Sequence, residues 1–417
     1  MKMTNIYKFL ALVAILGFSF FAFGKRGFSG NNEGFSRLLD DMELGPYSPA
    51  LMTKEPFNDK TAVDFVAGMK IGWNLGNTLD AHGDDNGFHW LGGGFYDNTA
   101  VSEMEGAWLG GRVTTLENIK AVKDAGFDII RIPVTWYKAA DSNFNIRKDW
   151  MERVTEIVNY AYDQDMYVIL NTHHDESIFK FMNRDTNKSL EVFRKIWMQI
   201  AAQFKNYGER LIFEGLNEPR TKGSGAEWNG GTQEERRNLN KHYEVFVDVV
   251  RNSGGNNDKR FLMISTYGAS STQNAMAGLA LPKDTASNKL IVSIHFYEPY
   301  NFALRTGSGT VSAWDKNNSA DTNPITSRID RAFSIFVSKG IPVIIGEMGA
   351  MNRENEAARA EWAEFYVSYA KSKGLPCIWW DNGATAGGGE RFGILNRSTN
   401  VFHFPSIISG LMKGAEL

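Results

Sequence analysis

The chain has 417 residues, of which 43% are hydrophobic and 22% are charged, and its formal net charge is −3. This composition predicts a soluble globular protein with a sizeable core, and the lack of a basic block argues against nucleic acid as a partner. The single cysteine, Cys377, excludes a disulfide framework. Aromatic residues make up 13% of the chain. This is more than a core needs, so some rings are expected to line a groove for a flat, hydroxyl-rich ligand.

The N-terminal residues have the pattern of a targeting segment. Lys2 and Lys8 precede an apolar run that extends to residue 23, with small residues at plausible cleavage positions. We therefore predict a secreted, cell-envelope or periplasmic protein with a signal peptide. Because Lys25 and Arg26 follow the run directly, an uncleaved anchor is the alternative. The expected organisation is a signal peptide or anchor over 1–26, a linker over 27–60 and one folded domain over 61–417.

Short apolar stretches alternate with amphipathic ones from residue 61 onwards. Strands are expected at 70–75, 127–134, 166–172, 210–217, 260–266, 289–297, 341–347 and 376–382. Helices are expected at 116–125, 150–164, 190–207, 234–251, 325–339 and 354–373. Near-continuous apolar strands separated by helices are typical of a parallel sheet covered on both faces. Eight such units predict an α/β fold, a closed (β/α)8 TIM barrel in a single domain. An open doubly wound sheet is the rival, but no glycine-rich phosphate turn follows the first strand.

Polar side chains gather where the expected strands end. Two of them are glutamates, Glu218 and Glu347, each of which follows an apolar stretch directly. In a barrel the carboxyl ends of the strands form one rim, where active sites are built. The residues expected on this rim are Asn77, Arg131, His173, His174, Asn217, Glu218, His295, Tyr297, Glu347 and Trp380.

Seven motifs, in order along the chain, carry a resemblance to a known family. They are GWNLGNTLDA (72–81), IIRIPVTW (129–136), NTHHD (171–175), GLNEPR (215–220), IHFYEPY (294–300), IIGEMGA (344–350) and WWDNG (379–383). Together they resemble glycoside hydrolase family 5, in its bacterial endo-β-1,4-glucanase and xyloglucanase-like branch. The resemblance covers nearly all of the folded domain, and it implies a retaining, endo-acting enzyme with Glu218 as acid/base and Glu347 as nucleophile.

The neighbouring residue types agree with these roles. Retaining cleavage needs one carboxylic acid to protonate the leaving oxygen and one ionised carboxylate to attack the anomeric carbon, about 5–5.5 Å apart. We expect partial burial and the charge of Glu347 to raise the pKa of Glu218. Arg131 is expected to keep Glu347 ionised, and Tyr297 to donate a hydrogen bond to the same carboxylate. Asn217 can bond the sugar 2-hydroxyl.

Further substrate contacts follow from the resemblance. It implies that His173 and His295 hydrogen-bond the substrate and position the catalytic carboxylates. It also implies that Asn77 reaches a glucose hydroxyl and that Trp380 forms the floor under the sugar next to the scissile bond. His174 is expected to shape the pocket.

Two adjacent histidines followed by an aspartate, His173, His174 and Asp175, could instead be metal ligands. Neighbouring residues on a strand point to opposite faces, so these two are poorly placed to hold one ion. Neither an HExxH pattern nor a Cys/His cluster is present. We therefore expect no metal and no cofactor.

Outer sugar subsites are harder to predict from the sequence. The candidates are Trp73, Trp136, Trp314, Phe95 and Tyr96, and for each a role in the core is at least as well supported. The long loops 81–111 and 221–231 set the shape of the subsites, and one sequence does not determine their conformation.

The predicted function is hydrolysis of a β-glucan polysaccharide, which could be cellulose, mixed-linkage glucan or xyloglucan. A β-mannanase of the same family, a non-catalytic glycan-binding barrel and a metal-dependent hydrolase are the alternatives. An acid/base pair is unnecessary for binding alone, which favours the enzyme. The polysaccharide is the expected partner, and we expect a monomer with no obligate protein partner.

Overall fold

The computed structural model describes residues 51, 53–82 and 99–416. The predicted signal peptide and most of the predicted linker lie outside the described residues, as do Phe95 and Tyr96. Near the end of the linker, the Glu55 carboxylate accepts a hydrogen bond from the backbone N–H of Gly208, 3.0 Å away. Within the described part of the chain, no helix combines the length and the apolar character needed to cross a bilayer.

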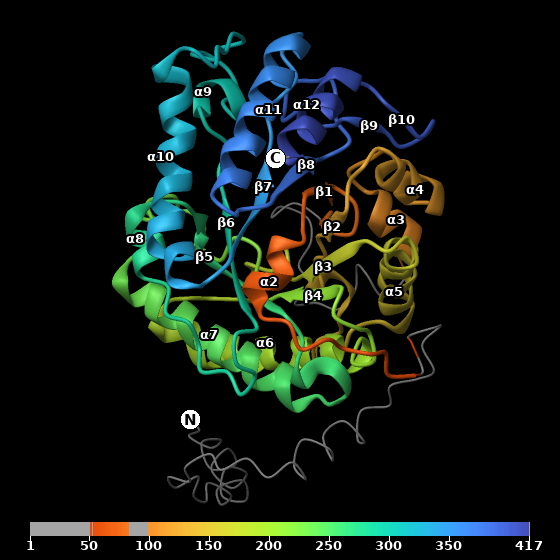
Figure 1. Cartoon of the computed structure of the whole chain (residues 1–417). Coiled ribbons are helices and arrows are strands. Elements are labelled where there is room, and N and C mark those ends of the chain that lie inside the picture. The colour runs from red at the N-terminus through yellow and green to blue at the C-terminus, as the bar shows by residue number, and fades with distance from the viewer. Residues whose placement is uncertain (1–50, 52, 83–98, 417) are drawn as a thin grey trace, which may run out of the picture. The chain divides into compact units, whose positions relative to one another are not determined.

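Eight parallel strands follow one another around a closed barrel, and β1 pairs with β8 to complete it (Figure 1). The strands are β1 (Ile71–Leu75), β2 (Ile129–Ile132), β3 (Tyr167–Asn171), β4 (Leu211–Glu214), β5 (Leu262–Ser270), β6 (Leu290–His295), β7 (Val343–Met348) and β8 (Cys377–Asp381). Their residues are almost all buried, as expected for strands covered on both faces. The predicted (β/α)8 barrel is confirmed.

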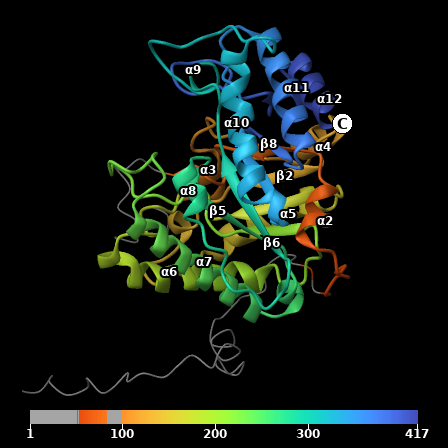
Figure 2. The same ribbon diagram turned by 60° about the vertical axis from the view of Figure 1, so that its left-hand side comes forward.

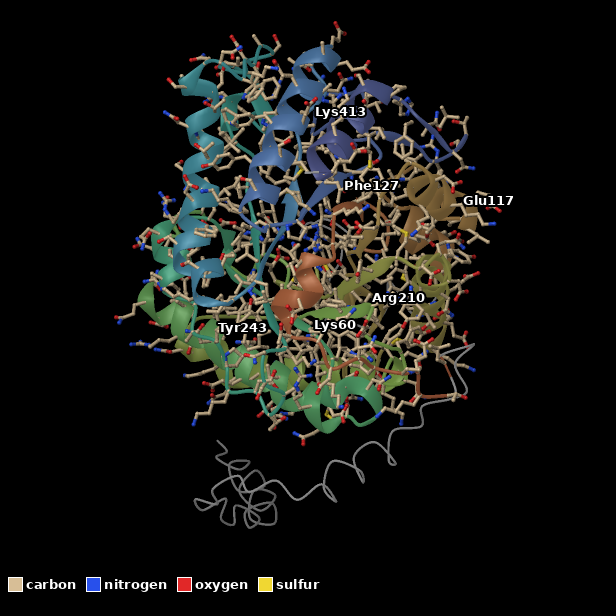
Figure 3. All side chains as sticks on the ribbon, in the orientation of Figure 1. Lys60, Glu117, Phe127, Arg210, Tyr243 and Lys413 are labelled. Carbon is tan, nitrogen blue, oxygen red and sulfur yellow. The ribbon has the colours of Figure 1, made fainter. Side chains whose placement is uncertain are left out.

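Helices lie outside the strands in both ribbon views (Figures 1 and 2). The longer ones are α4 (Leu116–Asp124), α5 (Lys148–Tyr162), α6 (Asn183–Gln203), α7 (Gln233–Asn252), α10 (Ser319–Ile335), α11 (Glu356–Ser372) and α12 (Pro405–Ala415). The shorter elements are α2 (Ala62–Ala67), α3 (Val101–Gly106), α8 (Gln273–Ala277), α9 (Tyr300–Ala303) and the strand pair β9 (Leu395–Asn396) and β10 (Val401–Phe402). Side chains fill the layer between strands and outer helices, where Phe127 and Tyr243 are fully buried (Figure 3).

Two helices, α6 and α10, begin six or more residues earlier than the sequence pattern predicts. Helix α6 begins seven residues before the expected start. Its first residues, NRDTNKS, are polar and carry no apolar periodicity, so the sequence pattern does not reveal them as helical. Helix α10 begins at Ser319 rather than at residue 325, and it includes Pro324. The side chain of Asn318 caps it by accepting a hydrogen bond from the backbone N–H of Ala320.

The amino ends of the strands are closed by α2. Thr61 caps this short helix, and Phe65 stacks on Phe261 with ring centroids 3.9 Å apart. The same apolar cluster contains one or more residues from each of strands β2 to β8. Apolar side chains therefore seal the interior of the barrel at this end.

Candidate active site

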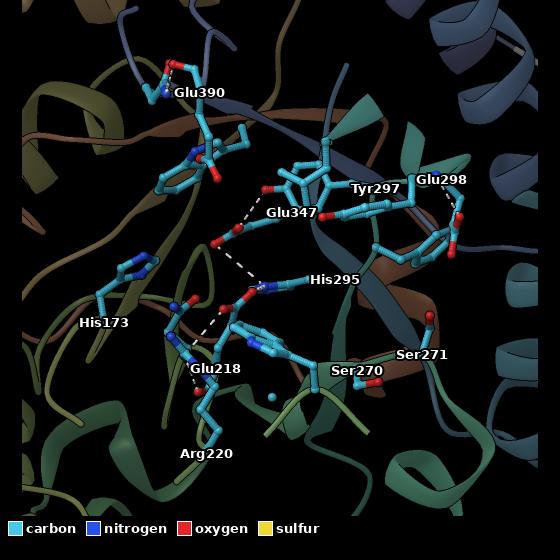
Figure 4. Close-up of a pocket in the computed structure, with 18 of the residues that line it drawn as sticks. His173, Glu218, Arg220, Ser270, Ser271, His295, Tyr297, Glu298, Glu347 and Glu390 are labelled. Carbon is cyan, nitrogen blue, oxygen red and sulfur yellow. Dashed lines mark hydrogen bonds and ion pairs between the residues drawn. The ribbon is translucent and has the colours of Figure 1, made fainter. Parts of the chain in front are cut away.

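The carboxyl ends of the strands surround an open cleft of about 660 Å³ (Figure 4). Nine of the ten predicted site residues line this cleft: Asn77, His173, His174, Asn217, Glu218, His295, Tyr297, Glu347 and Trp380. The tenth, Arg131, is fully buried. The barrel rim therefore brings together side chains that are widely separated in the sequence.

Glu218 and Glu347 lie on either side of His295. Glu347 belongs to β7 and is 5% exposed, whereas Glu218 lies four residues beyond the end of β4. The His295 Nδ1 atom is 3.1 Å from Glu218 Oε1 and 3.7 Å from Glu347 Oε1. One carboxylate oxygen of each glutamate lies within 4.8 Å of the other. This spacing fits the pair of a retaining glycosidase, whose carboxyl groups are about 5–5.5 Å apart, and is too short for the inverting arrangement.

Arg131 is the centre of a buried polar network beside this pair. Its guanidinium donates to Glu347 Oε1 at 2.9 Å, to Glu214 Oε2 at 2.7 Å, to Asn217 Oδ1 at 2.7 Å and to Asn74 Oδ1 at 3.0 Å. Burial lowers the pKa of Arg131, but the two carboxylates raise it more, so the side chain stays charged. One cation thus holds both the nucleophile candidate and the asparagine that precedes the acid candidate.

Glu214 is a member of this network that the sequence reasoning missed. It ends β4, is fully buried, and also accepts a hydrogen bond from Asn171 Nδ2 at 3.0 Å. The signal in the sequence is a glutamate inside the apolar stretch LIFE. A buried carboxylate requires a partner, which here is Arg131.

Both oxygens of the Glu347 carboxylate have donors. Arg131 occupies Oε1, and the Tyr297 hydroxyl donates to Oε2 at 2.8 Å. Burial raises the pKa of Tyr297 well above its ordinary value, as does the charge of Glu347, so the phenol remains a donor. The contacts expected for Arg131 and Tyr297 are therefore present in the structure.

The expected rise in the pKa of Glu218 is contradicted. Burial does raise it, but the hydrogen bond with His295 and the positive charge of Arg220 lower it more, so that the pKa of Glu218 lies below its ordinary value. Arg220 Nη1 is 3.5 Å from Glu218 Oε2 and 2.9 Å from its backbone oxygen. The sequence reasoning considered the charge of Glu347 and did not include this arginine.

The argument that His173 and His174 point to opposite faces is also wrong. Both lie beyond the last residue of β3, so strand alternation does not apply to them, and their ring centroids are only 4.5 Å apart. With Asp80 they bring three potential ligand atoms within 4.8 Å of one another. The Asp80 carboxylate already accepts hydrogen bonds from the backbone N–H groups of Asn77 and Thr78. The absence of a metal remains a prediction.

The two histidines differ in their electrostatic surroundings. Burial holds the pKa of His173 well below its ordinary value. Burial lowers the pKa of His174 too, but Glu176 raises it more, and the pKa lies above its ordinary value. His173 contacts Asn171 and stacks parallel to Trp380, with ring centroids 5.6 Å apart. It is thus placed to contact a substrate, while His295 contacts the catalytic pair.

The aromatic residues exposed in the cleft are not those predicted for the outer sugar subsites. Trp73, Trp136 and Trp314 are buried, so the suggestion that they contact sugar is contradicted. Trp380 lines the cleft as expected. Two tryptophans that the sequence reasoning did not single out, Trp108 and Trp228, are 40% and 57% exposed and line the same cleft.

Known proteins are similar to this chain in sequence and in fold. Residues 93–386 match the family described as Cellulase (glycosyl hydrolase family 5). Endoglucanase B of Ruminococcus albus is 44% identical over 368 residues, which are 87% of this chain and 83% of that protein. Endoglucanase A of Clostridium longisporum is 40% identical over 356 residues, covering 85% of this chain and 66% of that protein.

Solved structures that resemble this fold include an endoglucanase and a lichenase of the same family. A GH5-4 broad specificity endoglucanase from Ruminococcus champanellensis with bound cellotriose has a TM-score of 0.80 and 41% identity, covering 86% of this chain and all of that one. A family 5 lichenase from Caldicellulosiruptor sp. F32 has a TM-score of 0.80 and 40% identity, covering 89% of this chain and 99% of that one. Together with the cleft and its two glutamates, these matches show that the chain belongs to glycosyl hydrolase family 5 and is a glycoside hydrolase of the endoglucanase type.

Proposed function

We propose that this enzyme cleaves internal β-1,4 linkages of β-glucans with retention of the anomeric configuration. The observation that carries the proposal is the distance of at most 4.8 Å between oxygens of Glu218 and Glu347. This separation allows direct attack on the anomeric carbon and leaves no room for the water that an inverting enzyme places between sugar and base.

The proposed reaction has two displacements. In the first, Glu347 attacks the anomeric carbon and Glu218 gives its proton to the departing glycosidic oxygen, so that a glycosyl ester forms and the leaving sugar departs as an alcohol. In the second, Glu218 takes a proton from a water molecule, which attacks the same carbon and releases Glu347. Arg131 and Tyr297 hold the Glu347 carboxylate in place throughout.

In the free enzyme the pKa of Glu218 lies below its ordinary value. We propose that substrate binding raises this pKa, so that Glu218 carries the proton that it donates. The Glu218 side chain is 19% exposed, so a bound polysaccharide would remove the remaining water around it. Loss of this water disfavours the charged form of a carboxyl and moves its pKa upwards. The ester bond at Glu347 would then remove the neighbouring negative charge and favour the base form in the second step.

An open cleft of this kind can accept β-glucan chains of more than one type. We propose cellulose-type, mixed-linkage and xyloglucan chains as substrates, because the similar structures include broad specificity endoglucanases and a lichenase. Comparing products from xyloglucan, mixed-linkage glucan, carboxymethyl cellulose and glucomannan would establish the preference. Cleavage of glucomannan that is faster than cleavage of each of the β-glucans would contradict the proposed substrate range.

The mechanism is tested with Glu347→Ala. This variant should lose at least about 10⁴-fold in kcat while still binding cellotetraose, because the nucleophile is required for chemistry and less so for binding. The control Glu361→Ala, on the outer helix α11, should keep wild-type activity. NMR of the wild-type reaction should show the β anomer first. Wild-type activity in E347A, or an initial α anomer, would overturn the proposal.

The proposal on cellular location rests on the N-terminal pattern alone. We propose that the protein is exported as a monomer and that its leader is removed near residue 26. N-terminal sequencing of the exported protein, with its mass in solution, tests both statements. A chain that begins at Met1 and sediments with membranes would favour the uncleaved anchor.

A further inference from the structure

A second cavity, of about 660 Å³, lies beside the catalytic cleft and shares no lining residue with it. Ala384 and Glu390, in the loop after β8, line the cleft (Figure 4). Thr385 and Arg391 of the same loop line the second cavity. The rest of its lining comes from the loop after β7 and from the segment between α9 and α10. A cavity of this volume can hold a ligand of the size of a sugar.

Two arginine side chains line this second cavity. The guanidinium of Arg353 is held by hydrogen bonds that it donates to the backbone oxygens of Phe302 at 3.1 Å and Arg305 at 2.6 Å. Burial lowers the pKa of Arg353, and the positive charge of Arg391 lowers it further. The two guanidiniums are therefore close enough to repel each other, and an anion bound between them would relieve this repulsion.

The positive charge of the cavity is not neutralised within the described residues. Neither Arg353 nor Arg391 forms an ion pair with a described carboxylate, and Arg391 Nε is buried without a hydrogen-bond acceptor. Glu354 also lines the cavity, but it is exposed and pairs with neither arginine. Because a buried donor without an acceptor is unfavourable, this arrangement favours a ligand that brings negatively charged oxygens.

The other polar groups of the cavity suit a sugar ring. The hydroxyls of Thr310, Ser312 and Thr385 make no hydrogen bond with the part of the chain that the structure describes. The backbone N–H groups of Ala386 and Gly387 likewise have no acceptor among those residues. A hydroxyl both donates and accepts hydrogen bonds, so these groups can pair with the hydroxyls of a pyranose. The cavity thus combines two cations with groups that bind a hydroxyl-rich ring.

Hydrogen bonds tie the walls of the cavity together. Asn352 donates from its backbone N–H to Arg391 O at 2.8 Å and from Nδ2 to Thr385 O at 3.0 Å, which joins the loops after β7 and β8. Asn355 Nδ2 donates to Ser312 O at 2.9 Å, which adds the segment between α9 and α10. The three segments are therefore held in position before a ligand binds, and this reduces the ordering that binding requires.

We propose that this cavity is a second carbohydrate site, which binds a uronic acid residue, a pyranose whose C6 carbon is a carboxylate. Arg353 and Arg391 hold the carboxylate oxygens, because the guanidinium fork matches carboxylate geometry. The surrounding hydroxyls hold the ring. This inference goes beyond the proposed function, since the two catalytic glutamates take no part in it. The enzyme would thereby hold an acidic polysaccharide while a β-glucan occupies the cleft.

The test compares two ligands that differ only at C6, D-glucuronate and D-glucose, by isothermal titration calorimetry of the wild-type enzyme. Glucuronate should bind with a Kd in the millimolar range, and glucose at least about tenfold more weakly, because only glucuronate forms charge-assisted hydrogen bonds. In the inactive Glu347→Ala protein, saturating cellotetraose should change the glucuronate Kd by less than about twofold, since the two cavities share no lining residue.

Three variants identify the groups that bind. Arg391→Gln removes a guanidinium without described hydrogen bonds, so the Tm should stay the same while glucuronate binds about tenfold or more weakly. Glu354→Gln removes a negative charge beside the site and should strengthen binding by about twofold at low salt. The control Arg194→Gln, which alters an exposed arginine on α6, should leave the Kd unchanged.

Several results would overturn the uronic acid site. They are equal affinities for glucose and glucuronate, an unchanged Kd in R391Q, weaker binding in E354Q and displacement of glucuronate by cellotetraose. Sodium sulfate that binds as tightly as glucuronate and displaces it would show a site for free oxyanions, which also contradicts the proposal. Failure of the proposed function would instead appear as an active E347A enzyme, with the glucuronate Kd of the wild type unaffected.

Discussion

Arg131 offers the sharpest test of how the buried network holds the site. In Arg131→Met the side chain keeps an unbranched apolar stem but loses the guanidinium, with its charge and all four hydrogen bonds. The carboxylates of Glu214 and Glu347, 0% and 5% exposed, are then left without their cation. Removing one partner of a buried ion pair costs about 3–5 kcal/mol. Because a folded domain has about 5–15 kcal/mol of stability, the variant should fold but unfold at a clearly lower urea concentration.

Urea unfolding at two pH values distinguishes this cause from lost packing. Orphaned carboxylates can bind protons, so the loss in R131M should be smaller at pH 5 than at pH 8. Adding Glu214→Gln should recover about 1–2 kcal/mol in R131M, because one of the two unpaired charges is then absent. Arg194→Met, which breaks the exposed 2.8 Å pair with Asp248, should cost less than about 1 kcal/mol. A pH-independent loss in R131M that E214Q does not reduce would refute the reasoning.

Two further predictions concern buried groups. Burial lowers the pKa of His242 to about 4 from its ordinary 6.5. The folded protein therefore binds this proton more weakly than the unfolded chain does, and its stability should fall as the pH is lowered from 6.5 to 4. From pH 7 to 5 the loss is about 2 kcal/mol, and it should be absent in His242→Gln when the two proteins are unfolded in urea side by side. In Gly346→Ala the new Cβ would lie 2.7 Å from Ser293 Oγ and 2.8 Å from His295 Nε2. His295 or the backbone of β7 must then shift, which disturbs the contacts of His295 Nδ1 with the two glutamates. We expect kcat to fall about tenfold or more with little change in KM; unchanged kcat would show that the site tolerates this shift.

The fold could be predicted because burial leaves a regular mark on the sequence. Eight apolar stretches separated by amphipathic ones predict strands covered by helices, and the polar residue that ends a stretch reveals which end of the barrel faces the cleft. Glu218 and Glu347 were found this way. Helix starts were less certain, since the first turns of α6 are polar and α10 includes Pro324.

The ion pairs and pKa shifts of the site depend on contacts that the spacing of residues in the sequence does not reveal. Arg220 is two residues from Glu218, yet only the folded loop places its guanidinium 3.5 Å from the carboxylate and lowers the pKa of Glu218. Glu214 was hidden because a glutamate in an apolar strand gives no indication of its partner. The strength of an interaction between charges depends on their distance and on their burial, and both are set by tertiary structure.

The sequence by itself determined the barrel, the rim and the pair of glutamates, because hydrophobic periodicity and motif order are properties of the chain. Only the tertiary structure decided which of the remaining tryptophans face the cleft. Trp73 and Trp136 belong to recognisable motifs and are buried, whereas Trp108 and Trp228 lie in loops and are exposed. A tryptophan is apolar enough for a core and flat enough for a sugar. Its role is therefore fixed by what packs over it, which is decided by residues far away in the sequence.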